Sequence, residues 1–145
     1  IAFGDSVEPA LEMIEYPVLL DQPRPKLRAY APENVVAEKF QAMVALGRAN
    51  SRMKDFYDVW ALFKTFTFDP ERLARAIAAT FTRRTTAIPD TPPDALTESF
   101  ATDSAKQRQW TAFAADIVDA PRDLTQLIAE IAPLLMTAAQ NARAQ

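Results

Sequence analysis

The chain contains no cysteine, no histidine and only two glycines among its 145 residues. Without cysteine there are no disulfides, thiol nucleophiles or thiolate metal sites, and without histidine there is no imidazole metal site and no triad with a histidine base. The two glycines stand far apart, at Gly4 and Gly47. A P-loop or a GxGxxG turn needs several glycines in one turn, so both phosphate-binding motifs are excluded.

Charge of either sign is not in large excess, because 16 basic and 19 acidic side chains give a net charge of −3. A dedicated nucleic-acid binder usually carries a strong basic excess, so the composition leaves room only for a local basic patch. No run approaches the ~18 apolar residues of a transmembrane helix, and no secretory signal opens the chain. We therefore expect a cytoplasmic protein, and the start at Ile1 indicates a piece of a longer one.

The first 32 residues are rich in proline, with five of the 11 prolines of the chain. Proline fixes φ and lacks an N–H donor, so the short runs between these prolines can form only short or edge strands. The pattern predicts strands over residues 1–7, 16–20 and 26–31, as members of an incomplete sheet.

From Pro32 onward the apolar residues recur at helical spacing, as Val36, Phe40 and Met43 do, and Gly47 suits the end of this first helix. Later helices are predicted to begin after Ser51 as an N-cap, at Asp69–Pro70, around Asp94–Phe100, around Trp110 and at Pro121, the last with a kink or split at Pro133 and a frayed end over residues 138–145.

The fold class predicted from these patterns is α+β and mostly α. A small, incomplete β-sheet over residues 1–31 packs on one compact helical bundle over residues 32–145.

The residues most able to carry chemistry lie in the first two helices of this bundle. Lys39 falls about 60° from the centre of the first apolar stripe, while Glu38 points away, toward solvent or an i,i+4 partner. Asp55 aligns with apolar residues of the second helix and Asp58 lies nearer the edge. An unpaired carboxylate on an apolar face is costly. The turn near Gly47 makes the helices antiparallel, so we expect the Lys39 and Asp55 charges within about 6 Å.

Three basic residues, Arg48, Arg52 and Lys54, cluster at this turn and could receive phosphates. A purely structural interpretation stays open beside this one. Asp55 could simply stabilise the helix dipole, Lys39 could extend its stem along the apolar surface, and the basic turn could be solvated.

The segment VVAEKFQAMVALGRANSRMKDFYDVW, preceded by EYPVLLDQPRPKLRAY and by FGD at residues 3–5, resembles the C-terminal half of AbiEii/AbiGii toxin family nucleotidyltransferases. The resemblance implies a polymerase-β-like nucleotidyltransferase that uses Mg²⁺ and an NTP. It assigns the lysine of the family to Lys39 and its late aspartate to Asp55, with Asp58 as the alternative. The early Gly-Ser turn and its acidic metal ligands are missing, which leaves Asp5 as the one weak metal-ligand candidate.

The resemblance further implies a toxin of a toxin–antitoxin system, linked in some members to abortive infection. The leading hypothesis is a C-terminal fragment of an enzyme that transfers NMP to an RNA (tRNA-like) or protein acceptor. The fragment is expected to be inactive without the N-terminal half, and a cognate antitoxin is a possible partner. The alternative is a non-catalytic helical interaction module, or a remnant with a structural Lys39–Asp55 pair. A third hypothesis is tRNA docking through Arg72, Arg75, Arg83 and Arg84.

Overall fold

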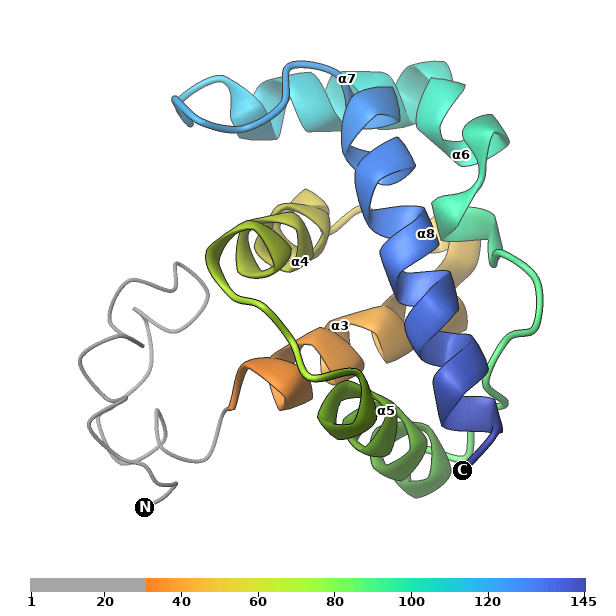
Figure 1. The fold of residues 1–145 in the computed structure, drawn as a ribbon. Helices are drawn as coiled ribbons and strands as arrows, with labels where there is room; N and C mark the ends of the chain where they lie inside the picture. Colours follow the sequence, from red (N-terminus) through yellow and green to blue (C-terminus); the bar gives the residue numbers. More distant parts are fainter. Residues whose placement is uncertain (1–30) are drawn as a thin grey trace.

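The computed structural model describes residues 31–145, which fold into a bundle of helices without strands (Figure 1). The sheet expected over residues 1–31 lies outside the described residues, except for Ala31, which precedes the first described helix. The described elements are α3 (Pro32–Leu46), η2 (Gly47–Ala49), α4 (Met53–Thr65), α5 (Pro70–Arg83), η3 (Asp94–Leu96), α6 (Glu98–Thr102), α7 (Ser104–Ala114) and α8 (Leu124–Arg143).

The long helix α8 organises the bundle, since both α4 and α5 pack against it and α3 packs against α5 (Figure 1). The buried aromatic rings join these elements, because their large apolar surfaces gain most from leaving water. Phe40 of α3 lies 5.4 Å from Phe81 of α5, and Phe56 of α4 stacks on Phe100 of α6 at 5.5 Å, measured between ring centroids. Trp110 anchors α7 in the same core.

The predicted ends of α3 and the start of α5 are confirmed. Pro32 opens α3, and Gly47 closes it with φ of +54°, a conformation that residues with a Cβ rarely adopt. Asp69 caps α5, since its carboxylate accepts a hydrogen bond from the backbone N–H of Glu71.

The predicted cap of α4 is wrong. The helix begins at Met53, and Ser51 does not cap it. Instead the side-chain oxygen of Asn50 accepts the backbone N–H of Arg52 at 2.8 Å. Asn50 is 1% exposed, so this interaction is built into the interior of the bundle.

The predictions for α8 are also corrected. The helix starts at Leu124 rather than Pro121, with Asp123 accepting the backbone N–H of Thr125. Pro133 does not split the helix. The expected fraying is wrong, because the C-terminal alanines of α8 lie in the core and keep the helix intact to Arg143. These are Ala138, Ala139 and Ala142.

Candidate functional site

Lys39 of α3 faces two carboxylates of α4 across the turn that joins the helices. Its ammonium lies 2.8 Å from Asp55 Oδ1 and 3.3 Å from Asp58 Oδ2. The Lys39 side chain is 17% exposed and the carboxylates are almost fully buried. The predicted proximity of Lys39 and Asp55 is therefore confirmed. Asp58 is deeper than its predicted edge position, because α4 is enclosed on most of its circumference.

Two further cations cover this pair of acids from the solvent side. Arg52 Nε lies 3.4 Å from Asp55 Oδ2, and Lys54 Nζ lies 2.8 Å from Asp58 Oδ2. Both cationic side chains are about half exposed or more, at 67% and 48%. We call these five residues the Lys39 cluster. Three cations and two carboxylates leave it with one positive charge in excess, and its exposed cations could contact an anion.

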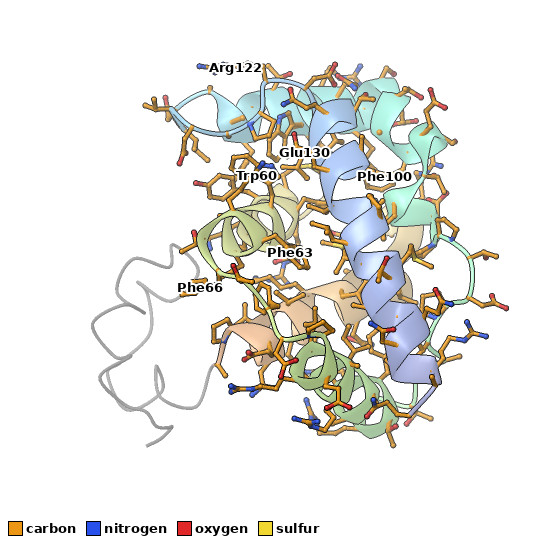
Figure 2. The ribbon with its side chains drawn as sticks, in the orientation of Figure 1. Trp60, Phe63, Phe66, Phe100, Arg122 and Glu130 are labelled. Carbon is orange, nitrogen blue, oxygen red and sulfur yellow. The ribbon has the colours of Figure 1, made fainter. Side chains whose placement is uncertain are left out.

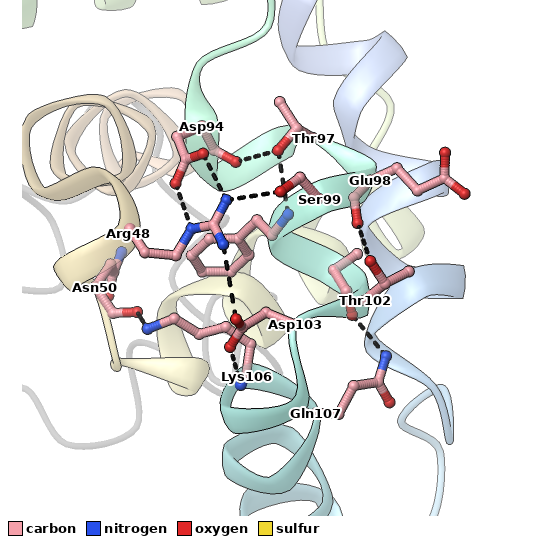
Figure 3. A network of polar contacts seen from close by, with 12 residues as sticks. Arg48, Asn50, Asp94, Thr97, Glu98, Ser99, Thr102, Asp103, Lys106 and Gln107 are labelled. Atoms are coloured by element: carbon pink, nitrogen blue, oxygen red, sulfur yellow. Dashed lines mark hydrogen bonds and ion pairs between the residues drawn. The ribbon is translucent and has the colours of Figure 1, made fainter.

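Arg48 stands apart from the Lys39 cluster, although it belongs to the same turn. Its guanidinium forms a bidentate pair with Asp94 at 2.7 and 2.8 Å, donates to Ser99, and lies 3.8 Å from Asp103 (Figure 3). The hydrogen bond from the Arg48 guanidinium lowers the pKa of Asp94, and the same hydrogen bond raises the pKa of Arg48. Arg48 therefore fastens the turn to the segment before α6 and, within residues 31–145, makes no ion pair with the cluster.

The cluster does not fit a magnesium ion. Within residues 31–145, no group of three or more acidic side chains is arranged to hold a metal. Mg²⁺ prefers carboxylate oxygens and water, whereas Asp55 and Asp58 already face three cations. Asp58 Oδ1 is buried and has no hydrogen-bond partner among the described residues. Since Asp58 Oδ2 already lies beside two cations, Lys39 and Lys54, a metal ion there would be a third cation and would be repelled.

The arginines of α5 and the arginine at its C-cap, Arg84, are engaged to different degrees. Arg83 and Arg84 both contact the carboxylate of Glu38 on α3. Within the part of the chain that the structure describes, Arg72 and Arg75 have only long pairs of 3.8 Å, with Glu33 and Glu71 respectively. Glu38 is 31% exposed, in keeping with the predicted solvent-facing position, and its partners lie at the end of another helix rather than at i,i+4.

Sequence reasoning missed a buried lysine on α7. Lys106 is 6% exposed, and its ammonium donates to the backbone carbonyl of Asn50 at 2.8 Å (Figure 3). One available signal was its spacing, since Lys106 precedes the buried Trp110 by four residues and so shares its face of the helix.

A second missed group joins α4 to α8. Trp60 and Glu130 lie close together (Figure 2), and the indole N–H of Trp60 donates to Glu130 at 2.8 Å. Lys64 lies 3.2 Å from the same carboxylate. These residues border a mainly apolar groove of about 400 Å³ with Phe63 and Leu134. The hydrogen bond from Trp60 lowers the pKa of Glu130, although its partial burial acts in the opposite direction. Nothing in the spacing of Trp60 and Glu130, 70 residues apart, indicated this contact.

Comparison with known families assigns nearly the whole chain. The family model described as nucleotidyl transferase AbiEii toxin, type IV TA system, matches residues 1–141. The chain belongs to the AbiEii family. No curated protein matches it, and no solved structure does.

Membership of the AbiEii family connects the chain to nucleotidyl transfer within a toxin–antitoxin system. Enzymes of this kind usually need a metal ion and an NTP. In the described part of the chain, no helix combines the length and the apolar character that a membrane crossing requires.

Proposed function

We propose that this AbiEii-family chain is the C-terminal part of a cytoplasmic nucleotidyltransferase that transfers NMP from an NTP to an RNA (tRNA-like) or protein acceptor. It acts as the toxin of a toxin–antitoxin system, with a cognate antitoxin as partner and a role in abortive infection. The observation that carries the proposal is the buried contact of Lys39 with Asp55 and Asp58 in a chain of this family.

The Lys39 cluster suits the charge requirements of nucleotidyl transfer. The reaction needs cations that neutralise the triphosphate while the attacking hydroxyl is held in line, and it needs neither histidine nor cysteine. Lys39 contacts the triphosphate as a compact point charge, and Asp55 orients Lys39 or assists the acceptor hydroxyl. Asp58 holds the same ammonium and is the alternative for that role.

The phosphate-binding role falls to Arg52 and Lys54. Both cations are exposed enough to leave their carboxylates and meet a triphosphate. Arg48 was the third candidate, but its guanidinium is committed to Asp94 in a bidentate pair. We therefore propose that Arg48 shapes the turn and that the other two cations bind phosphate.

The metal ion belongs to another part of the enzyme. Mg²⁺ bound with the NTP supplies Lewis-acid stabilisation of the phosphate oxygens. The carboxylates in residues 31–145 do not fit it, so we propose that its ligands come from the N-terminal half of the complete enzyme. Asp5 is the remaining candidate within this chain.

Transfer of a labelled nucleotide tests the proposal. The complete enzyme, with wild-type or Lys39→Met sequence, is incubated with Mg²⁺, α-³²P-labelled NTPs and total cellular RNA and protein. Lys39→Met is expected to reduce transfer at least ~100-fold, the scale seen when a charge-stabilising group is removed. The matched control is Lys64→Met, a lysine on α4 that pairs with Glu130 and is 60% exposed. Equal transfer by both variants would overturn the assignment.

The alternative is a non-catalytic helical module. It is favoured by one observation: both carboxylates of the Lys39 cluster are buried and paired, as in a structural ion-pair network. The two functions differ in inorganic tripolyphosphate binding by the 145-residue chain. A catalytic site binds it and loses about tenfold in affinity with Lys39→Met, whereas a structural network changes only in stability.

Docking of tRNA is a separate candidate. Among residues 31–145, Arg72 and Arg75 have only the long 3.8 Å pairs, so within that range they are the available cations of α5. If they bind tRNA phosphates, the double variant Arg72→Gln with Arg75→Gln weakens tRNA binding and lowers its salt dependence by about two phosphate contacts.

A further inference from the structure

We propose that Lys106 is a positioning residue for the Lys39 cluster. It acts through Asn50, whose two oxygens connect α7 to the first turn of α4. The inference rests on the proposed function for its consequence in phosphate binding, while the structural coupling stands on its own.

The ammonium of Lys106 is buried at a site with few partners. Lys106 is 6% exposed, and its Nζ donates to the carbonyl oxygen of Asn50 at 2.8 Å. The same ammonium lies 5.1 Å from the centroid of the Phe100 ring, within the range of a cation–π contact. Among residues 31–145 this ammonium makes no ion pair, and the carboxylate that it influences is Asp94, whose pKa it helps to lower. Burying an ammonium is costly, so the carbonyl of Asn50 is held by a group that has little alternative.

Asn50 transmits this constraint to the start of α4. Its backbone N–H donates to the Gly47 carbonyl at 3.0 Å, and its side-chain oxygen accepts the backbone N–H of Arg52 at 2.8 Å. Asn50 is 1% exposed, so water does not substitute easily for either contact. The residue before α4, Arg52, makes no side-chain cap of its own. Asn50 is therefore the side chain that satisfies the N–H of Arg52.

Arg52 is already a member of the Lys39 cluster. Its carbonyl accepts the backbone N–H of Asp55 at 3.0 Å, and its guanidinium lies 3.4 Å from the Asp55 carboxylate. The path from Lys106 through Asn50 and Arg52 to Asp55 is thus continuous, and Lys106 itself touches none of the cluster side chains. Figure 3 shows Lys106 reaching from α7 beneath Arg48 to Asn50.

The distance between Lys39 and Asp55 is sensitive to the contacts that run from Lys106 through Asn50 to the start of α4. Lys39 contacts Asp55 at 2.8 Å, and a shift of about 1 Å at the start of α4 would weaken that contact. Loss of the Lys106 ammonium removes the hydrogen bond that holds the Asn50 carbonyl. The Asn50 side chain, which accepts the N–H of Arg52, is then less firmly placed. The charges that meet a phosphate group would then lose their fixed arrangement.

The test compares three variants of α7 in the 145-residue chain. Lys106→Met keeps the apolar stem and removes the ammonium, and Lys106→Arg keeps a cation. Arg108→Met removes one positive charge from an exposed position of the same helix and serves as the control. If Lys106→Met does not fold, Lys106→Leu, which also lacks a donor, takes its place.

The first measurement is a double-mutant cycle with Lys39→Met, read by urea unfolding. We expect Lys106→Met to couple to Lys39→Met by at least ~threefold in the unfolding equilibrium constant, because the contact of Lys39 depends on the placement of α4. The cycle with Arg108→Met is expected to be additive. A local structural role of Lys106 would lower stability without coupling, so additivity in the Lys106 cycle overturns the proposal.

The second measurement is the affinity for inorganic tripolyphosphate. Lys106→Met is expected to weaken binding by about tenfold, Lys106→Arg to restore it to within about threefold of wild type, and Arg108→Met to leave it unchanged. An unchanged affinity with Lys106→Met in a chain that binds tripolyphosphate overturns the proposal. If wild type does not bind it, the proposed function fails, and the cycle alone decides whether Lys106 positions the cluster.

Discussion

Lys39 is shared by two buried carboxylates, so at the scale of single residues its loss leaves each with one exposed cation. Asp55 keeps Arg52 and Asp58 keeps Lys54. We predict that Lys39→Met lowers the free energy of unfolding by about 2 kcal/mol, the size of a charged hydrogen bond in a partly buried pair. Urea unfolding at neutral pH measures the change.

The control for that prediction is Lys64→Met on α4. Lys64 is 60% exposed, and its pair with Glu130 at 3.2 Å is a surface ion pair, which contributes about 0–1 kcal/mol. Equal losses for the two variants would show that burial of the carboxylates does not strengthen the Lys39 contacts.

The pKa of Glu130 provides a second prediction at this scale. The hydrogen bond from the Trp60 indole holds the pKa of Glu130 below its ordinary value of 4.5. A lowered pKa in the folded state stabilises the protein above the unfolded value, and this stabilisation is lost as the pH falls through the folded value. Trp60→Phe removes the donor, so the pKa of Glu130 rises and less stability is lost on acidification.

Carboxyl ¹³C NMR titration measures the shift of Glu130 in Trp60→Phe. Asp123 serves as an internal control, because its pKa is lowered chiefly by the backbone N–H of Thr125. A Glu130 titration curve that does not move in the variant would contradict the assigned cause.

The contact of Lys39 with Asp55 could be predicted from sequence, because both residues lie on short helices joined by one turn. The depth of Asp58 and the partner of Arg48 could not. Asp58 is buried by segments that the periodicity of α4 does not describe, and Arg48 meets Asp94, 46 residues away. Side-chain pairing across such distances is set by packing, which periodicity does not encode.

At the scale of the elements, α8 tolerates a proline at an exposed position of its middle. Pro133 has no N–H, so the carbonyl of Ala129 lacks its usual helical donor, although the helix continues to Arg143. We predict that Pro133→Ala raises the free energy of unfolding by about 1–3 kcal/mol, since alanine restores the bond and has the highest helix propensity. The gain is reduced by the greater freedom of the unfolded chain.

Urea unfolding of Pro133→Ala measures this gain, with Thr137→Ala at another exposed position of α8 as the control. The control is expected to change stability by less than about 0.5 kcal/mol. A loss of stability in Pro133→Ala would mean that the proline ring makes packing contacts that outweigh the missing bond.

Helix ends that are marked by a nearby proline, glycine or capping side chain could be predicted from the sequence. Helix ends that are fixed by packing against other helices could not. Pro32 and Gly47 delimit α3 through their own backbone, and the Asp69 side chain caps α5 by accepting a backbone N–H only two residues away. The end of α8 gave no such signal. Its alanines look unable to bury much surface, yet they are buried in a helix that packs against α5, and the helix stays intact to Arg143.

At the scale of the whole molecule, the bundle joins the turn after α3 to three separate segments. Arg48 binds Asp94 before α6, Lys106 of α7 binds Asn50, and Phe100 lies against both cations. The turn between α3 and α4 is thus held by residues more than 40 positions further along the chain. The sequence indicates the two helices of the site, while the scaffold that fixes them emerges only in three dimensions.

The 145-residue chain is predicted to transfer no nucleotide by itself. Neither glycine is followed by serine, so the sequence offers no Gly-Ser turn with acidic metal ligands. The carboxylates of the Lys39 cluster face cations and do not fit Mg²⁺, which needs several oxygen ligands. The assay uses purified chain, Mg²⁺, each α-³²P-labelled NTP and total RNA and protein, with a complete enzyme of the family as positive control. Labelled product that is made by the wild-type chain and absent with Lys39→Met would contradict the prediction, because only then does the activity follow this protein rather than a contaminant.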